Sequence, residues 1–401
     1  MIAFVGAAGL GATSSTVSHQ GSKTCTTLSA LNSVSLSSSF VSKSRFNGPS
    51  SRSHLLLSRA KSSVLKASAA SDSQESSSPL PIPAAAASTL KVGLYIALWY
   101  AFNIVYNISN KKALNALPLA WFVSWIQLVF GLAWIFPLWI FKVRKVPKLS
   151  MENIKAILPI AIAHTVGHVA TVASLGSVAV SFTHVIKSME PFFNVIGSAI
   201  VLRSVFPTPV YVSLLPIVAG VIVASVSELS FTWLGFASAM LSNLAFTGRN
   251  IFSKLNMDKP KGENMDAVNL FAVIQIISSV ILAPFALAVD GLQLKAAWTA
   301  ATTGAHALTN SQLLSTLFVS GLFFQLYQEV AFLALNSVHP VTHAVANTMK
   351  RVVIIITSIF VFQNPVTLAN MSGSAIAIAG VLIYSLVKNH FDAKAKAESA
   401  K

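Results

Sequence analysis

The chain has 401 residues, of which 54% are hydrophobic and 10% are charged, and its formal net charge is +16 at pH 7. Soluble domains carry roughly 25% charged residues, so this composition excludes an ordinary soluble protein and indicates a membrane protein with several spans. Basic residues that flank membrane helices explain the positive charge better than nucleic-acid binding does. We therefore expect membrane lipid around the protein and no nucleic-acid partner.

The N-terminal segment differs in composition from the rest of the chain. Residues 1–71 contain seven Lys and Arg residues, no Asp or Glu, many serines and Cys25, the only cysteine. This composition is typical of a transit peptide, and the abundance of Ser with little Arg favours a plastid over a mitochondrion. A disordered tail is the alternative. Residues 72–90, which contain three prolines and an alanine run, are typical of a linker.

Apolar segments of membrane-spanning length follow one another from Lys91 onward. We count ten, at about 92–110, 119–141, 155–177, 180–202, 208–227, 231–253, 267–289, 310–336, 340–362 and 366–387. Segments this long and uniformly apolar satisfy their backbone groups in lipid only as helices. We predict an all-α polytopic membrane protein with ten transmembrane helices in residues 91–390 and a basic C-terminal tail at 391–401.

The two halves of the predicted domain resemble each other weakly. An offset of 159 places the segment 179–184 on the segment 338–343. Five helices per repeat is an odd number, so copies at about 91–227 and 231–388 would cross the membrane in opposite directions, as in the inverted repeats of alternating-access transporters. Most Lys and Arg residues of the loops lie on the side shared by both termini. The positive-inside rule therefore predicts that both termini face the stroma of the plastid.

Two of the predicted spans carry three cations between them: Lys187 in the fourth, and Lys350 and Arg351 in the ninth. An ionisable side chain there costs at least ~2.5–3.5 kcal/mol on insertion scales. Snorkelling to the interface is the alternative, and it is easiest for Lys187 near the start of its helix. Together the three predict an anion site, because guanidinium binds phosphate oxygens with paired hydrogen bonds and ammonium acts as a point charge. Three further charged residues are candidates for a counter-charge, a gate or a group behind the site: Glu190, Arg249 and Glu329.

The third span places His164, His168 and Thr171 on one helical stripe. A zinc site needs at least three protein ligands and the span offers two histidines, so we expect no metal. His168 is expected to donate a hydrogen bond to a substrate oxygen, with helix packing as the alternative. Tyr327 in the eighth span carries a hydroxyl that needs a partner when buried, and a substrate could be that partner.

Four segments resemble the plastidic phosphate translocators, a family of the drug/metabolite transporter superfamily: YNISNKK (106–112), SFTHVIKSMEPFF (181–193), TGRNIFSK (247–254) and NTMKR (347–351). The resemblance covers about 91–390, and the leader fits it. It implies a ten-helix bundle of two inverted halves in the chloroplast inner envelope membrane. It also implies an antiporter that exchanges inorganic phosphate for phosphorylated sugars or acids without a cofactor. Carried over to this chain, the resemblance makes Lys187, Lys350 and Arg351 the phosphate clamp and places His168, Thr171 and Tyr327 around the rest of the substrate.

Similarity over the whole chain favours triose phosphates and 3-phosphoglycerate as the organic substrates. Phosphoenolpyruvate, hexose phosphate and pentose phosphate are alternatives within the family, and a nucleotide-sugar carrier of related fold is another. An intramembrane enzyme acting on phosphoesters would need a nucleophile or a metal beside the clamp, where the sequence offers only His168 and Glu190. We therefore expect a transporter and no enzyme. The sequence leaves open whether the chain forms a homodimer.

Overall fold

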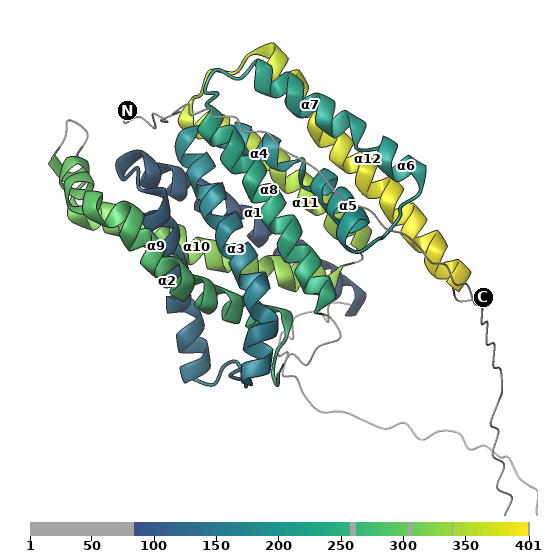
Figure 1. Cartoon of the computed structure of the whole chain (residues 1–401), viewed down its shortest axis with the longest axis horizontal. Coiled ribbons are helices and arrows are strands. Elements are labelled where there is room, and N and C mark those ends of the chain that lie inside the picture. Colours follow the sequence, from purple (N-terminus) through teal and green to yellow (C-terminus); the bar gives the residue numbers. More distant parts are fainter. Residues whose placement is uncertain (1–83, 257–261, 304–306, 339, 400–401) are drawn as a thin grey trace, which may run out of the picture. The chain divides into compact units, whose positions relative to one another are not determined.

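The computed structural model describes residues 84–256, 262–303, 307–338 and 340–399, which belong to one compact unit of the chain, Ser78–Lys401. The described residues form helices and one isolated antiparallel bridge, with no strand among them. The predicted transit peptide and the first part of the predicted linker lie outside them. Figure 1 shows the helices, which in chain order are α1 (Ala84–Ala116), α2 (Ala120–Ile140), α3 (Met151–Ser177), α4 (Val180–Lys187), α5 (Glu190–Val201), α6 (Thr208–Val212), α7 (Leu215–Val226), α8 (Trp233–Leu255), α9 (Ala267–Thr303), α10 (Asn310–Ser337), α11 (Pro340–Phe362) and α12 (Leu368–Ser399).

Among the described residues, eight helical segments are long and apolar enough to cross a membrane. They are α1, α2, α3, the α6–α7 segment, α9, α10, α11 and α12. This confirms an all-α membrane protein, whereas the count of ten spans stays a prediction. The predicted fourth span consists of two short helices, and the predicted sixth span, α8, does not qualify by composition. The end of the predicted linker and most of the predicted tail are helical, since α1 begins at Ala84 and α12 ends at Ser399.

The predicted fourth span is broken between α4 and α5 at Ser188 and Met189. Pro191 explains the break, because its ring would clash with the carbonyl group of Lys187 four residues earlier and it lacks an N–H. Lys187 therefore lies in the last turn of α4 and Glu190 in the first turn of α5. Each charge is favourable at its helix end, since a helix dipole is negative at the C-terminus and positive at the N-terminus.

Small residues allow α7 and α12 to pack closely, side by side (Figure 1). A Cβ atom added at Gly220 of α7 would lie 2.3 Å from the backbone nitrogen of Ala377, and one added at Gly373 of α12 would lie 2.5 Å from that of Ala224. Gly220 and Ala224 are four residues apart, as are Gly373 and Ala377. This is the small-xxx-small spacing that lets the backbones of membrane helices approach each other.

Buried apolar residues join several helix ends on the side where α1 ends and α2 begins. The cluster contains Ala113, Leu114, Leu117, Leu119, Phe122, Val123, Val172, Leu175, Val180, Leu313, Leu317 and Ile354. Lys111 adds a polar contact on the same side, because its Nζ donates to the carbonyl oxygens of Leu175 (2.7 Å) and Val178 (3.0 Å) at the end of α3. We call this side the closed side. It ties α1 to α3, α4, α10 and α11.

The α2–α3 loop lies at the opposite side and pairs with the segment that precedes α9. Lys148 and Glu263 exchange backbone hydrogen bonds of 3.1 Å, and their side chains form an exposed ion pair at 2.7 Å. Hydrogen bonding to Lys148 lowers the pKa of the Glu263 carboxyl, and the same contact raises the pKa of Lys148. This contact connects the start of α3 to the start of α9.

We predict that Gly220→Val destabilises the protein. The new side chain would meet backbone atoms of α12, which cannot rotate away, and overpacking of this kind typically costs about 1–3 kcal/mol or more. The melting temperature of the purified protein in detergent should fall. Gly93→Val is the matched control, because a Cβ at Gly93 meets nothing within 4 Å. Equal melting temperatures for the two variants would contradict close packing of α7 against α12.

Candidate functional site

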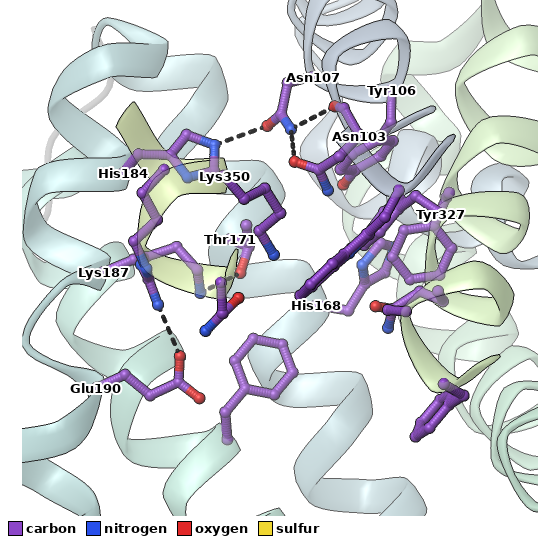
Figure 2. Close-up of a pocket in the computed structure, with 18 of the residues that line it drawn as sticks. Asn103, Tyr106, Asn107, His168, Thr171, His184, Lys187, Glu190, Tyr327 and Lys350 are labelled. Atoms are coloured by element: carbon purple, nitrogen blue, oxygen red, sulfur yellow. Dashed lines mark hydrogen bonds and ion pairs between the residues drawn. The ribbon is translucent and has the colours of Figure 1, made fainter. Parts of the chain in front are cut away.

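A cavity of about 290 Å³ lies among helices from both halves of the domain. Its charged lining groups are four cations and one carboxylate: Lys187, Arg249, Lys350, Arg351 and Glu190. Figure 2 shows His184, Lys187 and Glu190 on one wall, with His168 and Tyr327 on the facing wall. The structure thus brings together eight of the nine residues singled out from the sequence, all except Glu329.

The cavity extends from the middle of the helices away from the closed side. Along α1 its lining residues run from Trp99 to Asn107, and beyond them the helix enters the apolar cluster. Along α10 they run from Phe324 to Phe332, past the helix middle, whereas the start of α10 belongs to that cluster. The cavity is therefore sealed where α1 ends, and its lining continues towards the side where α1 begins.

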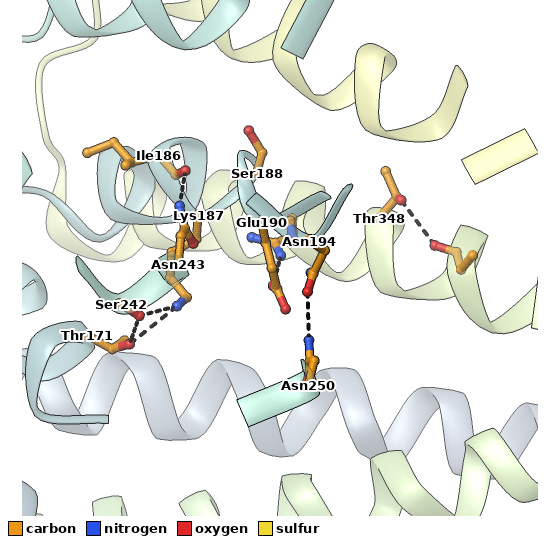
Figure 3. Close-up of polar contacts among 12 residues, drawn as sticks. Thr171, Ile186, Lys187, Ser188, Glu190, Asn194, Ser242, Asn243, Asn250 and Thr348 are labelled. Atoms are coloured by element: carbon orange, nitrogen blue, oxygen red, sulfur yellow. Dashed lines mark hydrogen bonds and ion pairs between the residues drawn. The ribbon is translucent and has the colours of Figure 1, made fainter. Parts of the chain in front are cut away.

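Lys187 is held by hydroxyl groups from two neighbouring helices. Its Nζ donates to Ser242 Oγ of α8 at 2.7 Å and to Thr171 Oγ1 of α3 at 3.3 Å (Figure 3). Thr171 donates its own hydrogen to the carbonyl oxygen of Gly167 at 2.8 Å, so its oxygen is free to accept. Next to Ser242, the Asn243 amide donates to the Ile186 carbonyl oxygen at 2.9 Å. Two successive residues of α8 therefore fix the end of α4 and its ammonium group.

Arg351 and Lys350, neighbours on α11, differ in their contacts. Arg351 Nη2 lies 3.0 Å from Glu190 Oε2, and this ion pair joins α11 to the start of α5. Lys350 Nζ donates no hydrogen bond to any described residue, and it lies 4.6 Å from the centre of the Trp99 ring. The ammonium of Lys350 therefore keeps its N–H groups available for a ligand.

The two remaining predicted ligand contacts also face the cavity. The buried Nε2 of His168 has no partner among the described residues. That nitrogen is therefore available for a hydrogen bond to a ligand in the cavity. The Tyr327 hydroxyl bonds no described residue, and its ring packs against Tyr106 and Phe324.

The other charged candidates have separate environments. Arg249 lies 3.5 Å from His164 Nδ1, and its guanidinium lies over Phe246. Glu329 is not among the residues that line the cavity. Its carboxylate instead pairs with Arg144 of the α2–α3 loop at 2.7 Å and accepts from Trp134 Nε1 at 2.9 Å.

Several cavity residues were not predicted from the sequence. Ser242 and Phe246 of α8, Trp99 of α1 and His184 of α4 all contact predicted site residues or line the cavity. His184 Nε2 donates to Asn107 Oδ1 at 2.9 Å. The sequence gives little indication of Ser242, Phe246 and Trp99, because serine and aromatic residues are ordinary packing residues of membrane helices. His184 is the exception, because it lies three residues before the predicted site residue Lys187 in the sequence.

This arrangement can bind a small anion of more than one charge. Four cations around one carboxylate leave a positive excess, and buried ions of one sign are costly unless opposite charge compensates them. The volume of about 290 Å³ lies at the lower end of the roughly 300–1,000 Å³ usual for small-molecule sites. A compact phosphorylated molecule suits both the charge and the size.

Comparison with known proteins agrees with this chemistry. A model of the Triose-phosphate Transporter family matches residues 90–385. The chain is 42% identical over 337 residues to glucose-6-phosphate/phosphate translocator 1, chloroplastic, of Arabidopsis thaliana, which covers 82% of this chain and 85% of that relative. It is 43% identical over 303 residues to phosphoenolpyruvate/phosphate translocator 1, chloroplastic, of Oryza sativa subsp. japonica (75% and 73% covered). It is 42% identical over 299 residues to the triose phosphate/phosphate translocator, chloroplastic, of Flaveria pringlei (75% and 72%).

We predict that Arg351→Gln sharply weakens binding of inorganic phosphate to the purified protein. Losing one partner of a desolvated charged contact costs ~2–5 kcal/mol, or roughly 30-fold to several-thousand-fold in affinity. Isothermal titration calorimetry measures the change. Arg203→Gln, at an exposed residue after α5, is the control and should bind as the wild type does. Wild-type affinity in a folded Arg351→Gln protein would remove Arg351 from the site.

Proposed function

The chain belongs to the Triose-phosphate Transporter family, and from this premise we propose that it is an antiporter, not an enzyme. It exchanges inorganic phosphate for triose phosphates and 3-phosphoglycerate across the chloroplast inner envelope membrane. The observation that carries the proposal is the cavity, in which Lys187, Lys350 and Arg351 face a space of metabolite size. Relatives that are chloroplastic by name support the compartment.

The organic substrate is the least constrained part of the proposal. Relatives named for glucose 6-phosphate, phosphoenolpyruvate and triose phosphate are almost equally similar to this chain, so identity does not select among them. An antiporter for phosphoenolpyruvate, pentose phosphate or hexose phosphate is the alternative. A nucleotide-sugar carrier is disfavoured, because about 290 Å³ is little room for such a ligand.

The contacts support a division of labour within the site. Lys187, Lys350 and Arg351 clamp the phosphate group. Arg351 also forms an ion pair with Glu190. Thr171 supports Lys187 directly, so it acts near the phosphate end. His168 and Tyr327 contact the carbon end, where the unpartnered Nε2 of His168 hydrogen-bonds a substrate oxygen. Arg249 is a candidate for a gate or for a contact with an acidic substrate.

Two features support ten spans in two inverted repeats. When α4–α5 and α6–α7 each count as one segment, the helices form ten segments. If each segment is replaced by the one five places away in chain order, the packed pair α1–α10 becomes α8–α3, which is also packed. The packed pairs α7–α12 and α2–α9 map onto themselves. Such reciprocal packing is expected for two related halves whose shared site lies between them.

The closed side and the cavity lining support alternating access. The apolar cluster and Lys111 seal the side where α1 ends, while the cavity lining continues towards the other side. By the positive-inside rule that other side is the stroma. The carrier is therefore in a state that faces the stromal side, and the opposite state requires the apolar cluster to separate.

We predict strict exchange in liposomes that contain the purified wild-type protein. Labelled phosphate should enter rapidly when phosphate, a triose phosphate or 3-phosphoglycerate is inside, and slowly when no counter-substrate is present. Lys350→Gln should abolish phosphate uptake both with and without a counter-substrate inside. Fast uptake into liposomes without counter-substrate would contradict antiport. A clear preference for internal phosphoenolpyruvate, glucose 6-phosphate or xylulose 5-phosphate would replace the proposed substrate and keep the exchange mechanism.

We also predict that a C-terminal tag is protected in intact plastids. The protease should cross the outer envelope and not the inner one. A second tag inserted after Ala307, in the loop between α9 and α10, should be cleaved in the same experiment because that loop lies on the opposite side. Cleavage of the C-terminal tag alone would show that the predicted orientation is wrong, and it would leave the proposed function unaffected.

A further inference from the structure

Two aromatic rings lie against the two lysines of the cavity. Lys350 Nζ of α11 lies 4.6 Å from the ring centre of Trp99 of α1, and Lys187 Nζ of α4 lies 4.6 Å from that of Phe246 of α8. Both distances fall within the ~6 Å at which an ammonium is attracted to the negative face of an aromatic ring. All four residues line the same cavity.

Each contact connects the two halves of the domain in a reciprocal manner. Trp99 belongs to the first half and its lysine to the second, whereas Phe246 belongs to the second half and its lysine to the first. In each half the ring is on the first helix of the five-segment unit and the lysine is on the fourth segment. The two pairs therefore lie on corresponding segments of the two halves.

The surroundings of the rings fix their positions. Trp99 is buried with Val330, Ala334 and Ala346, and it stacks on His343 at 5.1 Å between ring centres. Phe246 lies against Gly167 of α3, where an added Cβ would be 2.9 Å from the ring. Both rings are thus rigid supports, whereas a lysine side chain is a flexible stem with about 2 kcal/mol of rotamer entropy.

We propose that Trp99 and Phe246 are positioning residues of the phosphate site, each holding the lysine of the opposite half over its ring face so that the ammonium points its N–H groups at the incoming dianion. The inference rests on the proposed function. Lys350 depends on its ring more than Lys187 does, because Lys187 also has the hydroxyls of Ser242 and Thr171. The rings therefore set the affinity for phosphate without contacting it.

Replacing Trp99 tests this directly in the phosphate-exchange assay. For Trp99→Leu the KM for phosphate should rise roughly 2- to 30-fold, the range that corresponds to a cation–π contact, while the maximal rate falls less. Trp99→Phe keeps a weaker ring and should give an intermediate KM. Trp233→Leu is the matched control, because Trp233 is exposed at the start of α8 and packs against Phe231 and Phe236, which do not line the cavity, so its KM should stay at the wild-type value.

A series of fluorinated tryptophans at position 99 separates electrostatics from packing. Each added fluorine weakens the negative ring face and hardly changes its shape, so KM should rise stepwise with the number of fluorines. This series remains informative even if Trp99→Leu does not fold. A KM that is independent of fluorination would show that Trp99 only packs, and the proposal would be wrong.

The role of Phe246 is tested with two variants, Phe246→Leu and Gly167→Ala. Phe246→Leu should raise the KM for phosphate less than Trp99→Leu does, since the hydroxyls of Ser242 and Thr171 still hold Lys187. Gly167→Ala keeps the ring and displaces it, so it should raise KM in the same direction. An unchanged KM in both variants would overturn the role of Phe246. Absence of phosphate exchange by the wild type would instead reject the proposed function, so the two failures are distinguishable.

Discussion

The positive charge of the central cavity is the constraint on which the rest of the site depends. Four cations and one carboxylate line a cavity among helices, most of which are apolar enough to cross a membrane. Each buried ion needs an opposite charge, a hydrogen-bond acceptor or an aromatic face. Among the described residues, Arg351 has Glu190, Lys187 has two hydroxyls and a ring, and Lys350 has only a ring. The least satisfied cation is therefore the one most available to a ligand.

The break at Pro191 places two of these charges where a continuous helix could not. It ends α4 at Lys187 and starts α5 at Glu190, so the two charges lie at helix ends whose dipoles favour them. The carboxylate can then reach Arg351 on α11 while the ammonium turns to the hydroxyls of α3 and α8. On a continuous helix, Lys187 and Glu190 would lie one turn apart and face each other. With the break at Pro191, each of them contacts other helices instead.

Residue patterns predicted the broad fold and the charged part of the site, for physical reasons. Long apolar runs force helices in lipid, and a cation in such a run is conspicuous, as at Lys187 and Lys350. Ser242, Phe246 and Trp99 were missed because their residue types also serve helix packing. Glu329 was a candidate for a counter-charge, a gate or a group behind the site, and it lies outside the cavity lining because residues two apart on a helix, such as Tyr327 and Glu329, point to nearly opposite sides.

For the proposed antiporter, the same charge balance predicts that an empty carrier does not reorient. Closing the cavity without a ligand would bury four cations against one carboxylate, and each uncompensated ion costs several kcal/mol even after relaxation. A phosphate dianion cancels much of that excess, so the ligand stabilises the occluded state more than the open one, and this difference drives the switch. The aromatic rings hold the lysines in place but bring no net charge. They can therefore order the empty site without allowing it to close.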